Sequence, residues 1–296
     1  MTFAALALGG LLAIQSAPAQ PVQADQATAV EDVVVVGRQL DEQISSFLED
    51  VTLPEANMRV SRWNKGICVS VVNMRNDAAQ FIVDRVSEVA MGVGLEPGEP
   101  GCKANVTIIA AGNADTVARE MVDRYGHILR PDVADSTRNR AALRRFAETD
   151  AAVRWWHVSV LMDSHSGHAA VRMPKDDLAI VEGNYSRLRT ELRKDIASAV
   201  VILDINQLHN LNLSQIADYA AMVTLSQIDL DADFSGYNSI LAMEANPSIS
   251  GLTDWDRAYL SALYSASLSQ AQKSRQIQEI ADLMQHRELR EPQPAD

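Results

Sequence analysis

The sequence predicts one α+β domain with a small mixed β-sheet, helices packed on the sheet and a helical C-terminal part. Three observations lead to this fold class. Residues 200–203 form an apolar run rich in β-branched side chains, which is typical of a strand covered on both faces. Residues 213–228 carry apolar side chains at helical spacing and only one formal charge, which is typical of a central helix. Upstream of these segments lies a β-α-β pattern, and downstream of them the patterns are helical.

The composition fits a globular protein and argues against one broad class of function. The chain has 296 residues, 47% hydrophobic and 22% charged, enough for one large domain or two small ones. Its formal net charge of −13 argues against general nucleic-acid binding, which needs a basic face. The locally basic stretches at 138–145 and 187–194 are interpreted as solvated helix faces. Because no P-loop, G-x-G-x-x-G, C-x-x-C or G-x-S-x-G motif is present, we predict no cofactor.

The first residues of the chain predict its compartment. Residues 1–19 combine a short apolar core with a small-x-small cleavage pattern at Ala17, Pro18 and Ala19. We therefore expect a cleaved signal peptide and a periplasmic or secreted protein. No later stretch reaches the length of a transmembrane helix, so we expect no stable membrane span.

Residues 20–50 are predicted to form an acidic, flexible linker and a short N-terminal segment, with a short helix from residue 40. Within them, residues 33–38 (VVVVGR) resemble a TonB box, which docks on an envelope partner by adding a strand to the partner's sheet. The alternative is an ordinary edge strand or tail segment. We expect the α+β domain to span residues 51–290 and residues 291–296 to form a disordered tail.

The other elements follow from hydrophobic periodicity, capping residues and turn residues. They are a strand at 67–72, a helix at 77–92, a strand at 106–110, a helix at 114–125, a basic helix ending near 148, a strand at 153–162 with a hairpin partner at 169–173, a helix at 185–196, a helix opened by a capping box at Thr253 and Asp256, and a final helix around 277–284.

The two cysteines of the chain, Cys68 and Cys102, lie at the starts of the strands predicted at 67–72 and 106–110. If these strands are parallel neighbours, the two cysteines lie side by side. In an oxidising compartment this arrangement predicts a disulfide bond. A redox site is disfavoured because the pair lacks C-x-x-C spacing, and a metal site because no histidine lies at ligand spacing.

The central helix carries polar residues on a segment that we expect to be buried. Asp218 and Tyr219 need hydrogen-bond partners there, either within the structure or, as the alternative, from a ligand in a cleft that they line with Gln215. We keep both interpretations open, and take these three residues as the candidate ligand cleft.

A second candidate site lies around the turn after the strand at 153–162. His165 and His168 flank this turn, and Asp163 and His157 are the nearest residues that can complete a set of metal ligands. This set would support a metal-dependent hydrolase. The alternative is a pair of exposed turn histidines without a metal.

Four segments carry a resemblance to known proteins: RWNKGICVSV, PGCKANVTI, LSQIADYAAMV and GLTDWDRAYLSALY. Together they resemble a group of secreted proteobacterial proteins of unknown function and, distantly, the DUF2927 family, whose architecture is similar to that of zinc metallopeptidases. The resemblance extends over residues 59–265. It is strongest in the pattern LT-x-x-D-x-x-x-L-x-x-LY from Leu252 to Tyr264.

The resemblance implies a metallopeptidase-like scaffold without its zinc motif. A zinc peptidase needs His-Glu-x-x-His on a helix, but the corresponding five residues, 215–219, are Gln-Ile-Ala-Asp-Tyr and supply neither histidine nor a base at Ile216. We therefore lean against an enzyme. The main hypothesis is a non-catalytic protein that binds a peptide or cell-envelope component, and the alternative is the hydrolase.

Overall fold

The computed structural model describes residues 27–53, 59–131, 138–170 and 190–288. The predictions for the signal peptide (1–19) and the tail (291–296) lie outside these residues. Contacts within the chain divide it into two units, Met1–Gln39 and Leu40–Asp296. The sheet, the core and the candidate sites all belong to the second unit.

Residues 27–50 of the predicted linker and N-terminal segment belong to helix α1 (Ala27–Val51), and the possible docking strand at 33–38 is helical. Residues 20–26 lie outside the described residues. The four valines favour a strand by propensity, but positions 36, 40, 44, 47 and 51 are apolar and continue one helical period. The last turns of α1 bury Ile44, Phe47 and Val51 to 1% exposure or less. The compact unit therefore begins at Leu40 and not at residue 51.

The sheet of the second unit is mixed, as predicted. Its strands are β1 (Ser61–Arg62), β2 (Val69–Val72), β3 (Val106–Ala111), β4 (Val153–Asp163) and β5 (Leu192–Asp204). β2, β3 and β5 lie side by side in parallel, and β1 pairs in parallel with the start of β5. β4 runs antiparallel along the other side of β5. β5 is thus the central strand, as the apolar run at 200–203 indicates.

β5 is longer than predicted, because its first residues fall in the segment 185–196 that we expected to be helical. Residues 185–189 lie outside the described residues, but Leu192 to Ile196 are extended and pair with β4. β4 therefore pairs with β5, and residues 164–191 separate the two strands in the sequence. Only Ala169 and Ala170 of the expected hairpin partner are described, and they contact β4 at Met162 and Leu161.

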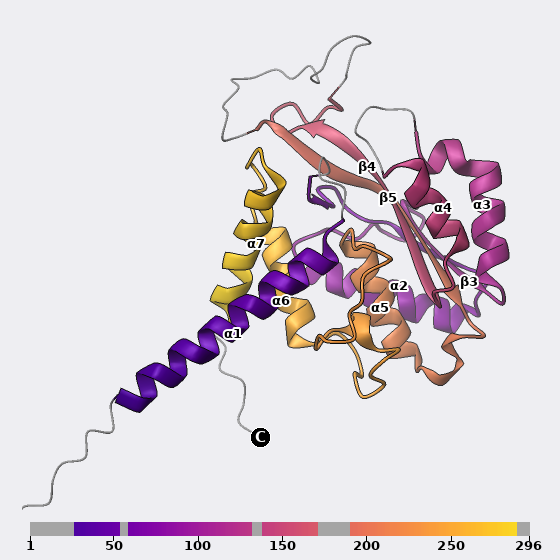
Figure 1. Ribbon diagram of the computed structural model, residues 1–296. Helices are drawn as coiled ribbons and strands as arrows, with labels where there is room; N and C mark the ends of the chain where they lie inside the picture. Colours follow the sequence, from indigo (N-terminus) through magenta and orange to yellow (C-terminus); the bar gives the residue numbers. More distant parts are fainter. Residues whose placement is uncertain (1–26, 54–58, 132–137, 171–189, 289–296) are drawn as a thin grey trace, which may run out of the picture. The chain divides into compact units, whose positions relative to one another are not determined.

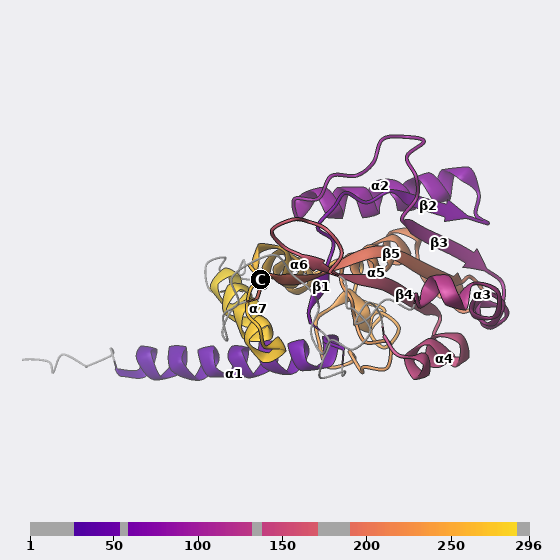
Figure 2. The same ribbon diagram turned by 90° about the horizontal axis from the view of Figure 1, so that it is seen from above.

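The helices cover both faces of the sheet. They are α2 (Asn76–Gly92), α3 (Ala114–Leu129), α4 (Arg140–Glu148), α5 (Leu213–Leu225), α6 (Asp254–Ser265) and α7 (Lys273–Glu288). The larger core contains side chains of α2, α5, α6 and α7 and one face of the sheet, and a smaller core contains those of α3 and α4 and the other face. Figure 2 shows α2 and α4 on opposite sides of the sheet. The helical C-terminal part is confirmed (Figure 1).

Helix α5 is central, as its lack of charge indicates. Ala217, Ala220 and Ala221 are fully buried, and α5 packs against α2. Small side chains at these positions allow the two helices to approach closely. The N-terminus of α5 is closed by a capping box between Asn212 and Gln215.

The predicted disulfide is present. Cys68 and Cys102 are joined, with their Cα atoms 6.1 Å apart. Parallel pairing of β2 and β3 brings the two cysteines together, since Val69 lies opposite Val106. The bond therefore encloses the segment that contains α2. Among the helices of the described residues, none is both long enough and apolar enough to cross a membrane.

Candidate functional site

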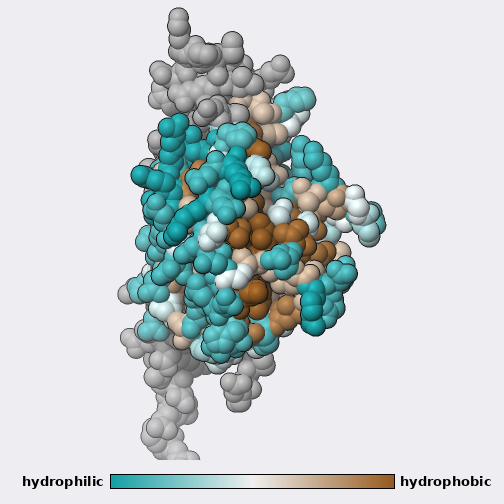
Figure 3. Space-filling model, turned by 90° about the vertical axis from the view of Figure 1, so that its right-hand side faces the viewer, coloured by the Kyte–Doolittle hydropathy of each residue, from teal (hydrophilic) through white to brown (hydrophobic). Residues whose placement is uncertain are grey.

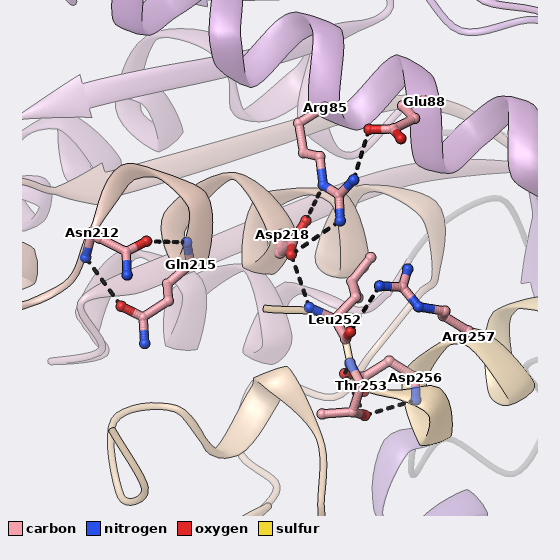
Figure 4. A network of polar contacts seen from close by, with 9 residues as sticks. All are labelled: Arg85, Glu88, Asn212, Gln215, Asp218, Leu252, Thr253, Asp256 and Arg257. Atoms are coloured by element: carbon pink, nitrogen blue, oxygen red, sulfur yellow. Dashed lines mark hydrogen bonds and ion pairs between the residues drawn. The ribbon is translucent and has the colours of Figure 1, made fainter. Parts of the chain in front are cut away.

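Asp218 lies at the centre of a polar network between α5, α2 and the segment before α6 (Figure 4). Its carboxylate forms an ion pair with Arg85 of α2 and accepts the backbone N–H of Leu252 at 2.8 Å. Arg85 also pairs with Glu88 at 2.6 Å. Asp218 is 2% exposed. Its hydrogen bond raises the pKa of Arg85, so the guanidinium stays charged beside a buried carboxylate.

The segment before α6 approaches the carboxylate of Asp218 closely at Gly251. A Cβ atom at Gly251 would overlap Oδ2 of Asp218, so only glycine allows the chain to pass this closely. The carbonyl of Leu252 accepts a hydrogen bond from Arg257 at 3.0 Å. Both oxygens of Asp218 are thus engaged within the protein. These contacts agree with the structural interpretation of Asp218.

Gln215 is also engaged by the fold. Its side-chain oxygen accepts the N–H of Asn212 at 3.1 Å, and its amide donates to the carbonyl of Ile249 at 2.7 Å. It therefore ties the start of α5 to the segment before α6. The sequence carries a signal for this role, because Asn followed three residues later by Gln is a capping pattern.

The sequence pattern from Leu252 to Tyr264 has a structural explanation. Thr253 and Asp256 form the predicted capping box of α6. Asp256 is fully buried and also accepts hydrogen bonds from Ser239 at 2.5 Å and from the backbone N–H of Ile240 at 2.8 Å. Burial raises the pKa of Asp256, and these hydrogen bonds act in the opposite direction. At the other end, Tyr264 donates to the carbonyl of Leu225 at 2.7 Å.

Tyr219, the next residue after Asp218, faces a different part of the molecule. It lines a cavity of about 210 Å³ between α5, the start of β4 and the segments 230–235 and 241–245. Its ring lies 6.1 Å from that of Trp155, in an edge-on arrangement. The lining residues of the cavity are Ala151, Val153, Trp155, Tyr219, Leu230, Ala232, Asp233, Phe234, Ser235, Leu241, Ala242, Glu244 and Ala245.

The hydroxyl of Tyr219 makes no hydrogen bond with any described residue, although the residue is only 6% exposed. The hydroxyl is not one of the fully buried polar atoms without a partner, so it is accessible to solvent. Burial raises the pKa of Tyr219, and the negative charge of Glu244 adds to this effect. The phenol therefore stays protonated and keeps both a donor and an acceptor function for a group that enters the cavity.

The four residues of the predicted metal site are not brought together. Among the described residues, no three His, Cys, Asp or Glu side chains are placed to hold a metal ion. His157 is 4% exposed, packs against α5, and approaches the carbonyl of Thr224 with Nε2 at 3.4 Å. Burial lowers the pKa of His157 to about 4. Six residues of extended chain separate it from Asp163, about 20 Å.

Asp163 organises the turn itself. Its side chain accepts the backbone N–H groups of His165 and Ser166, both at 2.8 Å. Gly167 completes the turn with a positive φ of 69°. The side chains of His165 and His168 are exposed, which agrees with the alternative of turn histidines without a metal. The hydrolase hypothesis therefore finds no site in the described residues.

The carboxyl ends of the parallel strands are a common ligand site in such sheets, but here the protein occupies it. Asp204, at the end of β5, accepts the N–H of Ala114 at 3.0 Å, and Asn113 accepts that of Thr116 at 2.8 Å. The first N–H groups of α3 thus already have acceptors. Nearby, the fully buried Arg154 pairs with Asp115 at 2.7 Å.

A second hollow, of about 640 Å³, lies between α3 and α4. It is lined by Val122, Gly126, His127, Arg130, Arg140, Leu143 and Arg144. Arg140 and Arg144 have no ion-pair partner among the described residues, whereas Arg145 pairs with Asp231 at 2.6 Å. Figure 3 views the side on which α3 and α4 lie, where hydrophobic side chains gather in the middle among hydrophilic ones. Arg140 and Arg144 are exposed, as predicted for a solvated basic helix face. The prediction is wrong for Arg138, which is buried and pairs with Asp229 at 3.2 Å, and for Lys194, which is buried in strand β5.

Of the three residues of the predicted cleft, one lines a cavity and two stabilise the fold. The cavity also contains residues that the sequence analysis did not select, chiefly Trp155, Phe234 and Glu244. Their positions along the chain give no sign that they meet. Compared with protein-family models, with curated proteins and with solved structures, the chain gave no match.

Proposed function

We propose that this protein is a non-catalytic binding protein of the periplasm or the secreted fraction, and that it binds a peptide or a cell-envelope component at the Tyr219 cavity. The resemblance to metallopeptidase-like proteins supports a scaffold of this kind without its zinc ligands. The observation that carries the proposal is a cavity with three aromatic residues in its lining, one of which, Tyr219, has a hydroxyl that makes no hydrogen bond with a described residue. Such a cavity offers apolar contact and one directed hydrogen bond, the usual composition of a ligand site.

The size of the cavity defines what it accommodates. Small-molecule sites usually measure about 300–1,000 Å³. The Tyr219 cavity, at about 210 Å³, is smaller. It suits one side chain or one terminal group of a longer ligand, whose remaining part lies on the surface. A peptide presents such a group repeatedly along an extended chain.

Non-catalytic binding follows from the state of the polar groups. The carboxylate of Asp218 is held by Arg85 and Leu252, and Asp218 does not line the cavity. Tyr219 stays protonated because burial raises its pKa, so it is a poor base at neutral pH. Binding through hydrogen bonds and apolar contact needs neither group to change its charge.

An array of random nine-residue peptides, probed with the full mature chain, tests the proposal. We expect a reproducible set of peptides to bind the wild type, and Tyr219→Phe to weaken their binding about tenfold, since a hydrogen bond to the hydroxyl is lost. Ala245→Trp, at an exposed position of the lining, should abolish binding by filling the cavity.

Tyr125→Phe is the matched control, because Tyr125 is 51% exposed on α3 and lies outside the cavity. It should bind the same peptides as the wild type. If no peptide binds, or if the bound set is unaffected by both cavity variants, the proposed site is wrong. Circular dichroism of each variant establishes that the fold is retained.

A further inference from the structure

We infer that the group taken up by the Tyr219 cavity is a protonated primary amine on an apolar stem, as in a lysine side chain. This inference rests on the proposed function and specifies the ligand of the same site. It depends on three properties of the lining: its charge, its aromatic walls and the placement of its acceptors.

The charged groups of the lining are all negative. Asp233 and Glu244 contribute two carboxylates, and the lining contains no lysine, arginine or histidine. Both carboxylates belong to exposed residues, so they lie at the solvent side of the cavity. An anionic group entering the cavity would meet repulsion from both, whereas a cation is attracted.

The walls of the cavity favour a cation with an apolar stem. Trp155, Tyr219 and Phe234 line the cavity and are each less than 10% exposed, and the face of an aromatic ring attracts a cation. The indole N–H of Trp155 already donates to the carbonyl of Ile228 at 3.0 Å, so this ring contributes apolar surface and its face. Leu230, Leu241 and several alanines supply further apolar contact for a methylene chain.

The acceptors of the lining come from three separate segments, which favours an ammonium over a guanidinium group. The hydroxyl of Tyr219 comes from α5, and the two carboxylates come from the separate segments around 233 and 244. Asp233 is fixed by the N–H of Ser235, which it accepts at 2.9 Å. An ammonium group directs three donors towards separate acceptors, whereas a guanidinium group pairs best with one carboxylate in a bidentate manner. The unpartnered oxygen of Tyr219 thereby gains a donor.

The test compares peptides that differ in one central residue. Nine-residue Gly/Ser peptides with a central lysine, norleucine, acetyl-lysine or arginine are titrated against the full mature chain by fluorescence anisotropy. We expect the lysine peptide to bind at least about tenfold more tightly than the norleucine and acetyl-lysine peptides, because both lack the charge. The arginine peptide should bind more weakly than the lysine peptide.

Two variants locate the effect. Glu244→Gln should weaken binding of the lysine peptide about fivefold and leave the norleucine peptide unchanged. Glu88→Gln, which removes an exposed carboxylate of α2 outside the cavity, is the matched control and should leave both unchanged.

The outcomes separate this inference from the proposed function. If the norleucine or arginine peptide binds as tightly as the lysine peptide, the inference of an amine ligand is wrong. The same holds if the peptides of the array whose binding depends on Tyr219 lack lysine. In both cases the proposed peptide site is retained. If lysine is preferred and this preference falls about fivefold in Glu244→Gln, the inference is supported. If the binding of no peptide depends on Tyr219, the proposed function and the inference are both wrong.

Discussion

Two adjacent residues of α5 have opposite roles. Asp218 and Tyr219 are both buried and polar, and both carry a group that needs a partner. Asp218 has its partners within the protein, in Arg85 and Leu252, while the hydroxyl of Tyr219 has none among the described residues. Successive residues of a helix point about 100° apart, so they face different neighbours. Their roles follow from those neighbours and not from their residue types.

Loss of the Asp218 charge should destabilise the protein strongly. In Asp218→Asn, we expect the free energy of unfolding to fall by about 2 kcal/mol, less than the 3–5 kcal/mol typical of a fully buried pair. The expected loss of stability is smaller because the side chain of Arg85 is 23% exposed. Urea denaturation at pH 7 measures the change.

Glu88, the exposed partner of Arg85, provides the control. Glu88→Gln removes the second carboxylate on Arg85, but its side chain is 65% exposed. Its loss should cost less than about 1 kcal/mol, as for other surface ion pairs. Equal losses in Asp218→Asn and Glu88→Gln would show that the buried ion pair is not the stabilising contact.

At the scale of elements, α2 is held from two directions. The disulfide joins the segments on either side of it, and α5 packs along it through small side chains. The sequence predicts this arrangement because both cysteines precede strands of a β-α-β pattern. Elements whose partners are distant in sequence were predicted less well. The start of β5 forms a strand because it pairs with β4, and α1 forms a helix although valines favour strands.

Removal of the disulfide should lower the stability of the whole unit. In the double variant Cys68→Ala and Cys102→Ala, we expect the free energy of unfolding to fall by about 3–4 kcal/mol, because the bond restricts a long loop in the unfolded chain. The chain has no other cysteine, so reduction of the wild type must give the same loss. A variant as stable as the oxidised wild type would contradict this account.

At the scale of the whole compact unit, helices cover the sheet on both faces, and the sheet therefore carries buried polar residues on both faces. Arg154 faces the smaller core and pairs with Asp115, whereas His157 faces α5 in the larger core. No carboxylate of the described residues pairs with this histidine, and burial lowers its pKa to about 4 from an ordinary value of 6.5. Its burial therefore couples the stability of the fold to pH.

Acidification should destabilise the protein through His157. Between pH 6.5 and about 4 the unfolded chain binds a proton at this residue and the folded chain does not. Stability is therefore fully present above pH 6.5 and is lost as the pH falls, by about 3 kcal/mol in total. Urea denaturation from pH 7.5 to 4 measures the loss, and His157→Gln should reduce it.

The exposed His168 is the matched control, since His168→Gln should retain the pH dependence of the wild type. Titration of the His157 ring by NMR measures its pKa directly, whether or not the variant is stable. A pKa near 6.5, or an unchanged pH dependence in His157→Gln, would contradict the role of this residue.

The sequence by itself determined the fold class, the central strand and helix, the disulfide and the capping box of α6. Each of these depends on local periodicity, on capping residues or on two cysteines at equivalent positions of a repeated β-α unit. Only the tertiary structure decided that Asp218 and Gln215 are held by the protein, that His157 lies apart from the turn histidines, and that Tyr219 meets Trp155, Phe234 and Glu244 in a cavity. The physical reason is that a site joins side chains from segments far apart in the chain, and the packing that brings them together leaves no periodic signal in the sequence.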